Sequence, residues 1–527
     1  MLGCGHHLSH MKLRWKIVVG LAALGVGALW LYSASHNPQR NLEQTRDSLR
    51  RQGFKLDRSE FTLSTSPEMR ARATVLSNAI GPRSVWLSMR GDIVSASRTR
   101  SNAAPVIWKE QSLVTESSTN AWPELRSSLG DGKGANSTWS NWSQVREVVL
   151  AEPLRFEPAA LAGSRDMMWP HLSRLRSLEL AFQARLLLDL HDGDSEEAWL
   201  DLLASTRLVT DWVPEPAAIC QTVRCLLVTV AYDSTWEALQ ADHWSEEQLA
   251  QLQREWETAD FFTALPETAA FTRATLSAGL EAGRQQPLLA SARPPSILSD
   301  PEGFFAALRE RQRQIHYRRR GSFDDERAML LFYRDRELEL RRAVTCSTWQ
   351  EIRALPVVTN LPSFRSPGQG FQSRGGFRQG GFGGPGRRQG LLARAADSEA
   401  RRRILVTALS LERYHRRHGA YPKTLEALAP ECLKTVPRDF MDGKPLRYCT
   451  TDDGHYLLYS VGLDCTDNGG KASISQQGSD PPDGPVVFDY QEGTDLVWPR
   501  PIALGAVEAQ SGATQRGPEN QLSLSKP

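Results

Sequence analysis

The chain has 527 residues, of which 24% are charged and 40% hydrophobic, as in an ordinary globular protein of several domains. A formal net charge of +2 excludes a strong overall attraction to nucleic acid or to an anionic surface. Seven cysteines are too few for a disulfide scaffold of this length, and no CxxC spacing indicates a zinc site.

An apolar stretch near the N-terminus, Ile17–Tyr32, predicts a helix that spans a membrane. It covers roughly 24 Å as a helix, and flanking residues extend the anchor to 12–34, closer to a bilayer core of about 30 Å. Lys12, Arg14 and Lys16 precede it, so the positive-inside rule places the N-terminus in the cytoplasm. A cleaved signal peptide fits the same pattern, but the aromatic residues at both ends favour an uncleaved anchor.

We therefore expect a single-pass protein of the cell membrane whose bulk is periplasmic or extracytoplasmic. The first ten residues contain four side chains of types that bind metals: Cys4, His6, His7 and His10. Met11 would itself be an ordinary start for such an anchor, so we assign no site to them. Three later cysteines lie close enough in the sequence for one disulfide, although free thiols fit equally well: Cys432, Cys449 and Cys465.

After the anchor, Arg40–Lys55 has helical character and predicts a stalk. The stretch to about residue 150 is poorly patterned, and we expect its tryptophans to pack a loop-rich segment onto a neighbour. From 159 to 285, leucines recur at helical spacing. Asp194 with Glu197, and Ser245 with Gln248, have the spacing of helix caps. Helices separated by short breaks predict a helical bundle or a short solenoid of helical hairpins.

A linker containing proline precedes a further helical stretch over 302–349, which is interrupted by the basic run Arg318–Arg320 before Gly321. Ser366–Gly390 is rich in Gly, Arg and Phe, a composition found in segments that bind RNA. On an exported chain we read it as a flexible tether and expect no nucleic acid partner.

The C-terminal part predicts a small α+β module. A helix that Asp397 or Ser398 can cap ends at Gly419, and a short helix follows. Asp453-Gly454 then predicts a hairpin turn between two strands, followed by a polar loop.

This order resembles the soluble domain of the major pseudopilin of type II secretion over residues 398–470. Two family motifs carry the resemblance, one around a Gly-x-Tyr-Pro turn and one in the strands: Gly419, Tyr421, Pro422, Leu425, Leu428, Asp439, Gly443, Pro445, Tyr448, Tyr456, Leu458, Ser460, Gly462 and Asp464. The whole chain also looks like large membrane-anchored proteins of Planctomycetes and Verrucomicrobia that end in such a module.

The resemblance implies a fold more than an activity. A pseudopilin helix continues from its membrane segment behind a prepilin cleavage site, which the anchor here lacks, so we do not expect assembly into a filament. The family's terminal loop binds calcium. Asp464, Asp467 and Asn468 offer oxygen ligands for this ion, although the same residues are compatible with a simple turn.

The sequence contains no nucleophile, metal or phosphate-loop pattern that identifies an enzyme. Glu412, His415 and His418 share a helix face, but a partner helix with the same pair is missing. His171, His191, His243 and His316 are isolated along the chain. A scaffold or protein-binding role in the envelope is therefore the first hypothesis, and an exported hydrolase with an unrecognised site is the alternative.

These predictions divide the chain into seven parts. They are a cytoplasmic tail, the anchor, a stalk with an irregular region, a helical domain, the tether, the pseudopilin-like module and a C-terminal tail: 1–11, 12–34, 35–158, 159–355, 356–392, 393–498 and 499–527.

Overall fold

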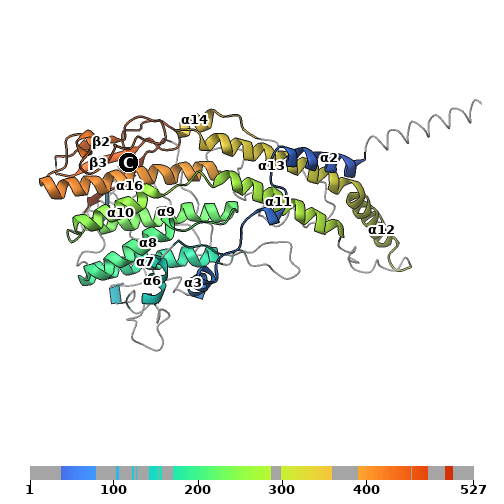
Figure 1. Ribbon diagram of the computed structural model, residues 1–527, viewed down its shortest axis with the longest axis horizontal. Helices are drawn as coiled ribbons and strands as arrows, with labels where there is room; N and C mark the ends of the chain where they lie inside the picture. The colour runs from blue at the N-terminus through green and yellow to red at the C-terminus, as the bar shows by residue number, and fades with distance from the viewer. Residues whose placement is uncertain are drawn as a thin grey trace, which may run out of the picture. The chain divides into compact units, whose positions relative to one another are not determined.

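The computed structural model describes a mainly helical protein with a small three-stranded sheet, as the sequence predicts (Figure 1). The described residues are 37–78, 103–105, 122–123, 126, 142–151, 153–156, 169, 171–285, 298–358, 390–452, 454–472 and 493–502. No helix within these ranges combines the length and apolar character needed to cross a membrane. The predicted anchor, 12–34, lies outside the described residues and stays a prediction.

The described chain divides into two compact units, and the division falls within helices α11 (Leu265–Gln285) and α13 (Ser322–Val344). The first unit contains described residues from 37–61, 270–285, 298–336 and 358. Besides parts of α11 and α13 it holds α2, η1, α12 and a π-helical turn, η2: Pro38–Arg51, Arg58–Glu60, Pro301–His316 and Tyr317–Gly321. The predicted break at Arg318–Arg320 is this π-helical turn.

A buried carboxylate joins three helices of the first unit. Glu326 on α13 pairs with Arg46 on α2 at 2.5 Å and with Arg284 on α11 at 2.6 Å. Ser277 on α11 donates to the same carboxylate at 2.6 Å. A carboxylate this deeply buried is stable only when it is paired and hydrogen-bonded. The predicted stalk is thus a helix, but its Leu42 is buried and its Arg46 ties it to the unit.

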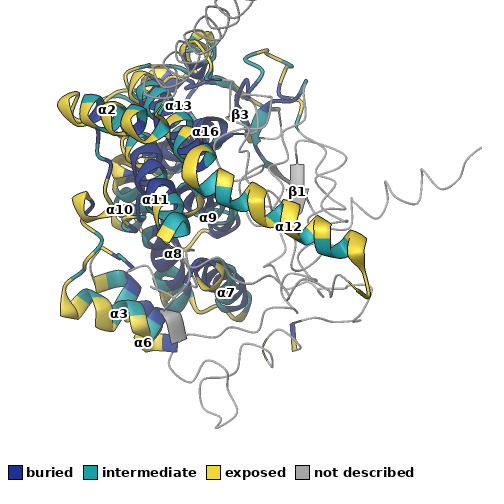
Figure 2. Cartoon of the chain, turned by 90° about the vertical axis from the view of Figure 1, so that its right-hand side faces the viewer, coloured by how far each residue is buried: buried dark blue, intermediate teal, exposed yellow. Residues whose placement is uncertain are grey.

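The second unit contains the other helices, the sheet and the rest of the described chain. The helices are α3, α6, α7, α8, α9, α10, α14, α16 and a 3-10 turn, η4: Pro67–Asn78, Trp142–Ala151, His171–Asp192, Ser195–Thr210, Ala218–Ala238, Glu246–Thr258, Trp349–Ala354, Leu391–His418 and Leu425–Leu428. Figure 2 shows many buried residues on α8 and α9, in contrast to α12, which has none.

The helix ends follow local sequence signals. Asp194 caps α8 by accepting the amide of Glu197, and Ser245 forms a full capping box with Gln248 on α10. Asp194 and Glu197 have the spacing of a capping box, but the carboxylate of Glu197 binds Arg146 at 2.6 Å instead of completing it. Gly419 ends α16 with a φ of 73°, a left-handed conformation that glycine adopts without strain.

Two of the predicted packing tryptophans lie in the described residues, and both are buried. Trp142 packs against Phe182 of α7 with ring centroids 4.7 Å apart, and its indole donates to Asp201 at 3.1 Å. Trp122 stacks on His191 at 4.1 Å. The packing interpretation is therefore confirmed for these two residues, and the others lie outside the described ranges.

The start of α16 differs from the prediction. The helix begins at Leu391 with Gly390 at its N-cap, so Asp397 and Ser398 lie inside it. Asp397 binds Arg401 one turn later at 2.8 Å, and Ser398 is buried. Both side chains are of a type that can cap a helix, but tertiary contacts determine where this helix starts.

Helix α16 is the centre of the second unit. It packs on α9 and α10 on one side and contacts strands β3 and β4 as well (Figure 1). Buried alanines such as Ala396, Ala400 and Ala408 allow neighbouring backbones to approach closely. The helix that begins the predicted module is therefore packed onto helices of the helical domain, and the low-complexity stretch lies outside the described residues.

The sheet has the order β2-β3-β4 and is antiparallel throughout: Arg447–Thr450, Tyr456–Ser460 and Leu496–Trp498. Tyr448 pairs with Leu458, which pairs in turn with Trp498. The two strands predicted around Gly454 are therefore confirmed. A separate parallel pair joins β1 and β5: Ala103–Pro105 and Arg500–Ile502.

Candidate functional site

A buried carboxylate fixes the turn that forms one wall of the candidate site. Asp439 accepts hydrogen bonds from the amides of Met441 at 2.9 Å and Val461 at 3.0 Å, and from the hydroxyl of Ser460 at 2.7 Å. Arg447 adds a fourth contact at 3.2 Å. Burial raises the pKa of Asp439 even so, since desolvation outweighs these bonds.

The short helix α14 forms the opposite wall and is docked through its backbone. The amides of Trp349 and Gln350 donate to the carbonyls of Phe440 at 2.8 Å and Met441 at 3.0 Å. The indole of Trp349 is fully buried and donates to Leu463 O at 2.9 Å. These bonds hold α14 to the turn at both of its first two residues.

Gly443 allows the two walls to approach each other. Its φ is +75°, and a Cβ at this position would lie 2.9 Å from Thr348 Cγ2. Thr348 caps α14 by accepting the amide of Glu351 at 3.2 Å. The Gly443 of the Asp439-to-Tyr448 motif therefore has a packing role in this chain.

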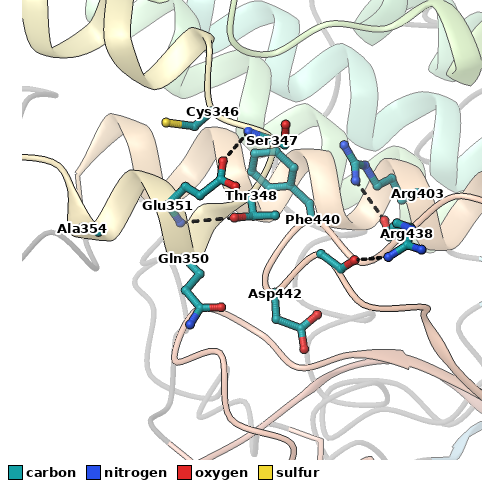
Figure 3. Close-up of a pocket in the computed structure, with 11 residues that line it drawn as sticks. Cys346, Ser347, Thr348, Gln350, Glu351, Ala354, Arg403, Arg438, Phe440 and Asp442 are labelled. Carbon is teal, nitrogen blue, oxygen red and sulfur yellow. Dashed lines mark hydrogen bonds between the residues drawn. The ribbon is translucent and has the colours of Figure 1, made fainter.

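Between these walls lies an open pocket of about 730 Å³ (Figure 3). Side chains from α14 and the segment before it face residues of the 438–443 turn and Arg403 of α16. The lining residues are Cys346, Ser347, Thr348, Gln350, Glu351, Ala354, Arg403, Arg438, Phe440, Asp442 and Gly443.

The charges around the pocket are partly neutralised. Arg403 binds Glu399 at 2.7 Å and donates to Arg438 O at 2.9 Å. Asp442 binds Arg447 at 2.7 Å, and this bond lowers the pKa of Asp442 against the opposing effect of burial. Arg438 is exposed and donates to Gly443 O at 2.9 Å. Arg403 is thus paired with a carboxylate, whereas the described hydrogen bond of Arg438 goes to a neutral carbonyl group.

The polar groups of the pocket suit recognition of a polar chain. Glu351 is held by the amide of Ser347 at 2.7 Å. Gln350 is exposed and offers both a donor and an acceptor on its side chain. Phe440 adds a ring at the base, packed 5.2 Å from Phe262. A ligand here would meet two arginines, two carboxylates and the amide of Gln350 around an aromatic side chain.

The described lining of the pocket does not activate Cys346 or Ser347 as a nucleophile. Burial, and then the charge of Glu351, raise the pKa of the Cys346 thiol, which disfavours the reactive thiolate. Among the described residues that line the pocket, none is a histidine that could act as a base for Cys346 or Ser347.

The predicted calcium residues lie in one loop, where their polar groups already have protein partners. Asp464 accepts the amides of Thr466 at 2.9 Å and Gly493 at 3.0 Å. Asp467 binds Arg447 at 3.1 Å and accepts Tyr459 OH at 3.0 Å. The backbone amide of Asn468 donates to the carboxylate of Asp495.

Arg447 therefore supplies a positive charge among the carboxylates of Asp439, Asp442 and Asp467. Burial lowers the pKa of Arg447, but its hydrogen bonds to Asp442 and Asp467 outweigh this effect and raise it. The loop is ordered by these contacts and by backbone amides, and calcium binding at Asp464, Asp467 and Asn468 stays a prediction.

On the predicted face, Glu412 and His415 contact the same tyrosine, whereas His418 has a different partner. Glu412 accepts Tyr421 OH at 2.9 Å, His415 stacks on Tyr421 at 4.4 Å, and His418 binds Glu431 at 3.1 Å. These residues pack the end of α16 and do not converge on one ligand.

Sequence reasoning missed the pocket, although one signal for the α14 wall was present. Thr348 followed by Glu351 has the spacing of a helix cap. The contribution of Arg403, more than 30 residues before the turn, arises only from the tertiary fold. All six cysteines of the described chain, including the predicted pairing candidates, are free.

Comparisons with protein-family models, with curated proteins and with solved structures found no match to the chain.

Proposed function

We propose that the protein is a single-pass, membrane-anchored protein of the bacterial envelope that binds a partner polypeptide and has no catalytic activity of its own. In this proposal the anchor at 12–34 holds the chain at the membrane. A helical domain and a pseudopilin-like module, packed together, present the binding site outside the cytoplasm.

The pocket between α14 and the 438–443 turn carries the proposal. Its walls are fixed by backbone hydrogen bonds from Trp349 and Gln350, so the site is preorganised. Arg438 and Gln350 offer directional polar contacts, and Phe440 offers an apolar one. This mixture is typical of surfaces that recognise a polypeptide segment. We expect a carboxylate of the partner to lie opposite Arg438.

The packing of α16 supports a role outside filament assembly. A helix buried on most sides by its own chain cannot offer the same surface to neighbouring subunits. Here α9, α10 and the sheet cover α16. The pseudopilin-like module would thus serve as a folded platform for the pocket.

The test is crosslinked affinity capture from the native envelope with the full chain in detergent. We compare the unaltered protein with Arg438→Glu and with the control Lys423→Glu, an exposed residue of the same module with the same change in charge. The proposal predicts one reproducible partner whose capture falls roughly tenfold or more with Arg438→Glu only. Equal capture by both variants, or only non-specific proteins, would contradict it.

A further inference from the structure

A histidine, a glutamate and a cysteine meet in the interior of the second unit. His171 is the first residue of α7, Glu215 lies between α8 and α9, and Cys220 is in the first turn of α9. Their exposed fractions are 3%, 1% and 0%. One ligand atom from each lies within 4.8 Å of the other two. Two segments distant in the sequence, the start of α7 and the 215–220 stretch, therefore bring metal-binding side chains together.

Two neighbouring segments hold this group in place. Leu154 exchanges backbone hydrogen bonds with Asp211 and Val213, which fixes the 153–156 segment beside the turn that carries Glu215. Phe156 then donates its amide to Glu215 Oε1 at 3.0 Å. Its ring stacks on His171 with centroids 4.3 Å apart and planes 5° apart. Such second contacts orient ligand side chains in many metal sites.

Two polar atoms of the group face each other without a hydrogen bond. His171 Nε2 and Glu215 Oε2 are both buried and lie 3.5 Å apart, and neither has a hydrogen-bond partner among the described residues. A carboxylate with so little exposure is costly unless a cation or donors compensate it. Phe156 N occupies Glu215 Oε1, so Oε2, which lies close to His171 and to the Cys220 thiol, is the oxygen that a metal would take.

We propose that His171, Glu215 and Cys220 bind one zinc-type divalent metal ion. Imidazole nitrogen, carboxylate oxygen and thiolate sulfur are the ligands that Zn²⁺ takes in proteins. Tetrahedral zinc places its ligand atoms roughly 3.3–3.8 Å apart. The separation of His171 and Glu215 already falls in this range, and Cys220 needs a shift of about 1.3 Å or less.

Binding has a defined proton balance. The metal takes the thiolate form of Cys220, whose proton leaves to solvent, and a water completes four-coordination. With three protein ligands and one water, the ion would join the start of α7 to the connection before α9. The alternative is that the site holds no metal and that His171, Glu215 and Cys220 contact one another directly.

The experiment titrates the full chain, purified in detergent and stripped with a chelator, with Co²⁺ and then with Zn²⁺. Co²⁺ reports a thiolate ligand through a charge-transfer absorption, and Zn²⁺ displaces it. The matched variants are Cys220→Ser and Cys225→Ser, since Cys225 is a second buried cysteine on α9 outside the group. Cys4, His6, His7 and His10 are present in both variants, so the difference between them reports the buried site.

The proposal predicts that Cys225→Ser retains the absorption and that Cys220→Ser loses it together with one equivalent of cobalt per chain. If Cys220→Ser does not fold, His171→Gln is compared with His191→Gln at the other end of α7. Only His171→Gln should weaken cobalt binding, by roughly tenfold or more. Identical titrations within either pair, or no cobalt bound by the unaltered chain, would overturn the assignment.

Discussion

Glu412 is a half-buried carboxylate that two tyrosines contact from different elements. Tyr421 OH donates at 2.9 Å and Tyr456 OH lies at 3.5 Å. Desolvation raises the pKa of Glu412 to about 7, and the hydrogen bonds from the tyrosines oppose this shift only in part. The folded protein therefore holds a proton at Glu412 over a pH range in which the unfolded chain has lost it.

This raised pKa predicts a stability that depends on pH. Between about pH 4.5 and pH 7 the native state binds the extra proton, so the free energy of unfolding falls as the pH rises through this window. Glu412→Gln should abolish that loss. The free energy of unfolding of Glu412→Gln, relative to that of the unaltered protein, should be higher at pH 8 than at pH 5 by up to about 3 kcal/mol.

The measurement is denaturant unfolding of the full chain at both pH values. Glu196→Gln, an exposed residue of α8, removes a carboxylate outside this cluster and serves as the control. The same pH dependence in Glu412→Gln and in the unaltered protein would rule out the assigned role of Glu412.

At the scale of elements, α14 is the segment on which the pocket most depends. It is short, and isolated helices of such length are not stable in water. Its position comes from Trp349, which is fully buried, and from the two backbone bonds to the 438–443 turn. Removing the Trp349 side chain should free α14 while leaving α16 and the sheet in place.

Trp349→Ala should therefore increase amide hydrogen exchange in α14. Truncating a buried tryptophan costs about 3–5 kcal/mol, most of it felt where the side chain packs. We expect faster exchange at Gln350 and in the 438–443 turn, with little change in α9. Gln350→Ala, an exposed neighbour, is the control and should exchange as the unaltered protein does. Uniform loss of protection across the second unit would show that Trp349 supports the whole core instead.

Local signals predicted some elements of the fold well. Leu172, Leu175 and Leu178 are buried on α7 as their spacing indicates, and Gly419 ends α16. The start of α16 could not be predicted, because Asp397 has the side chain of a cap yet binds Arg401 within the helix. Propensity names residues that can cap a helix, whereas packing on α9 and α10 decides how far this one extends.

At the scale of the whole molecule, candidate sites depend on contacts between distant segments. His171 is isolated in the sequence and lies beside Glu215 and Cys220 only because α7, α8 and α9 pack together. The pocket likewise needs Arg403, Thr348 and Arg438 from separate segments. The spacing rules used for metal and catalytic motifs detect ligands on one element, so neither arrangement could be read from the chain.

The predicted anchor and the packed second unit together define what the protein would do in the cell. A membrane segment at 12–34 would keep the chain at the envelope, and burial of α16 leaves the pocket, not the helix, as the surface for a partner. We therefore propose that a polypeptide occupies the pocket between α14 and the 438–443 turn.

The most direct measurement is photocrosslinking in native cells from a photoreactive residue at position 350, in the pocket. The same residue at position 423, exposed elsewhere in the module, is the control. We expect a discrete adduct with one envelope protein from position 350 and none of that mass from position 423. Failure to form an adduct at position 350, or the same adducts from both positions, would contradict it.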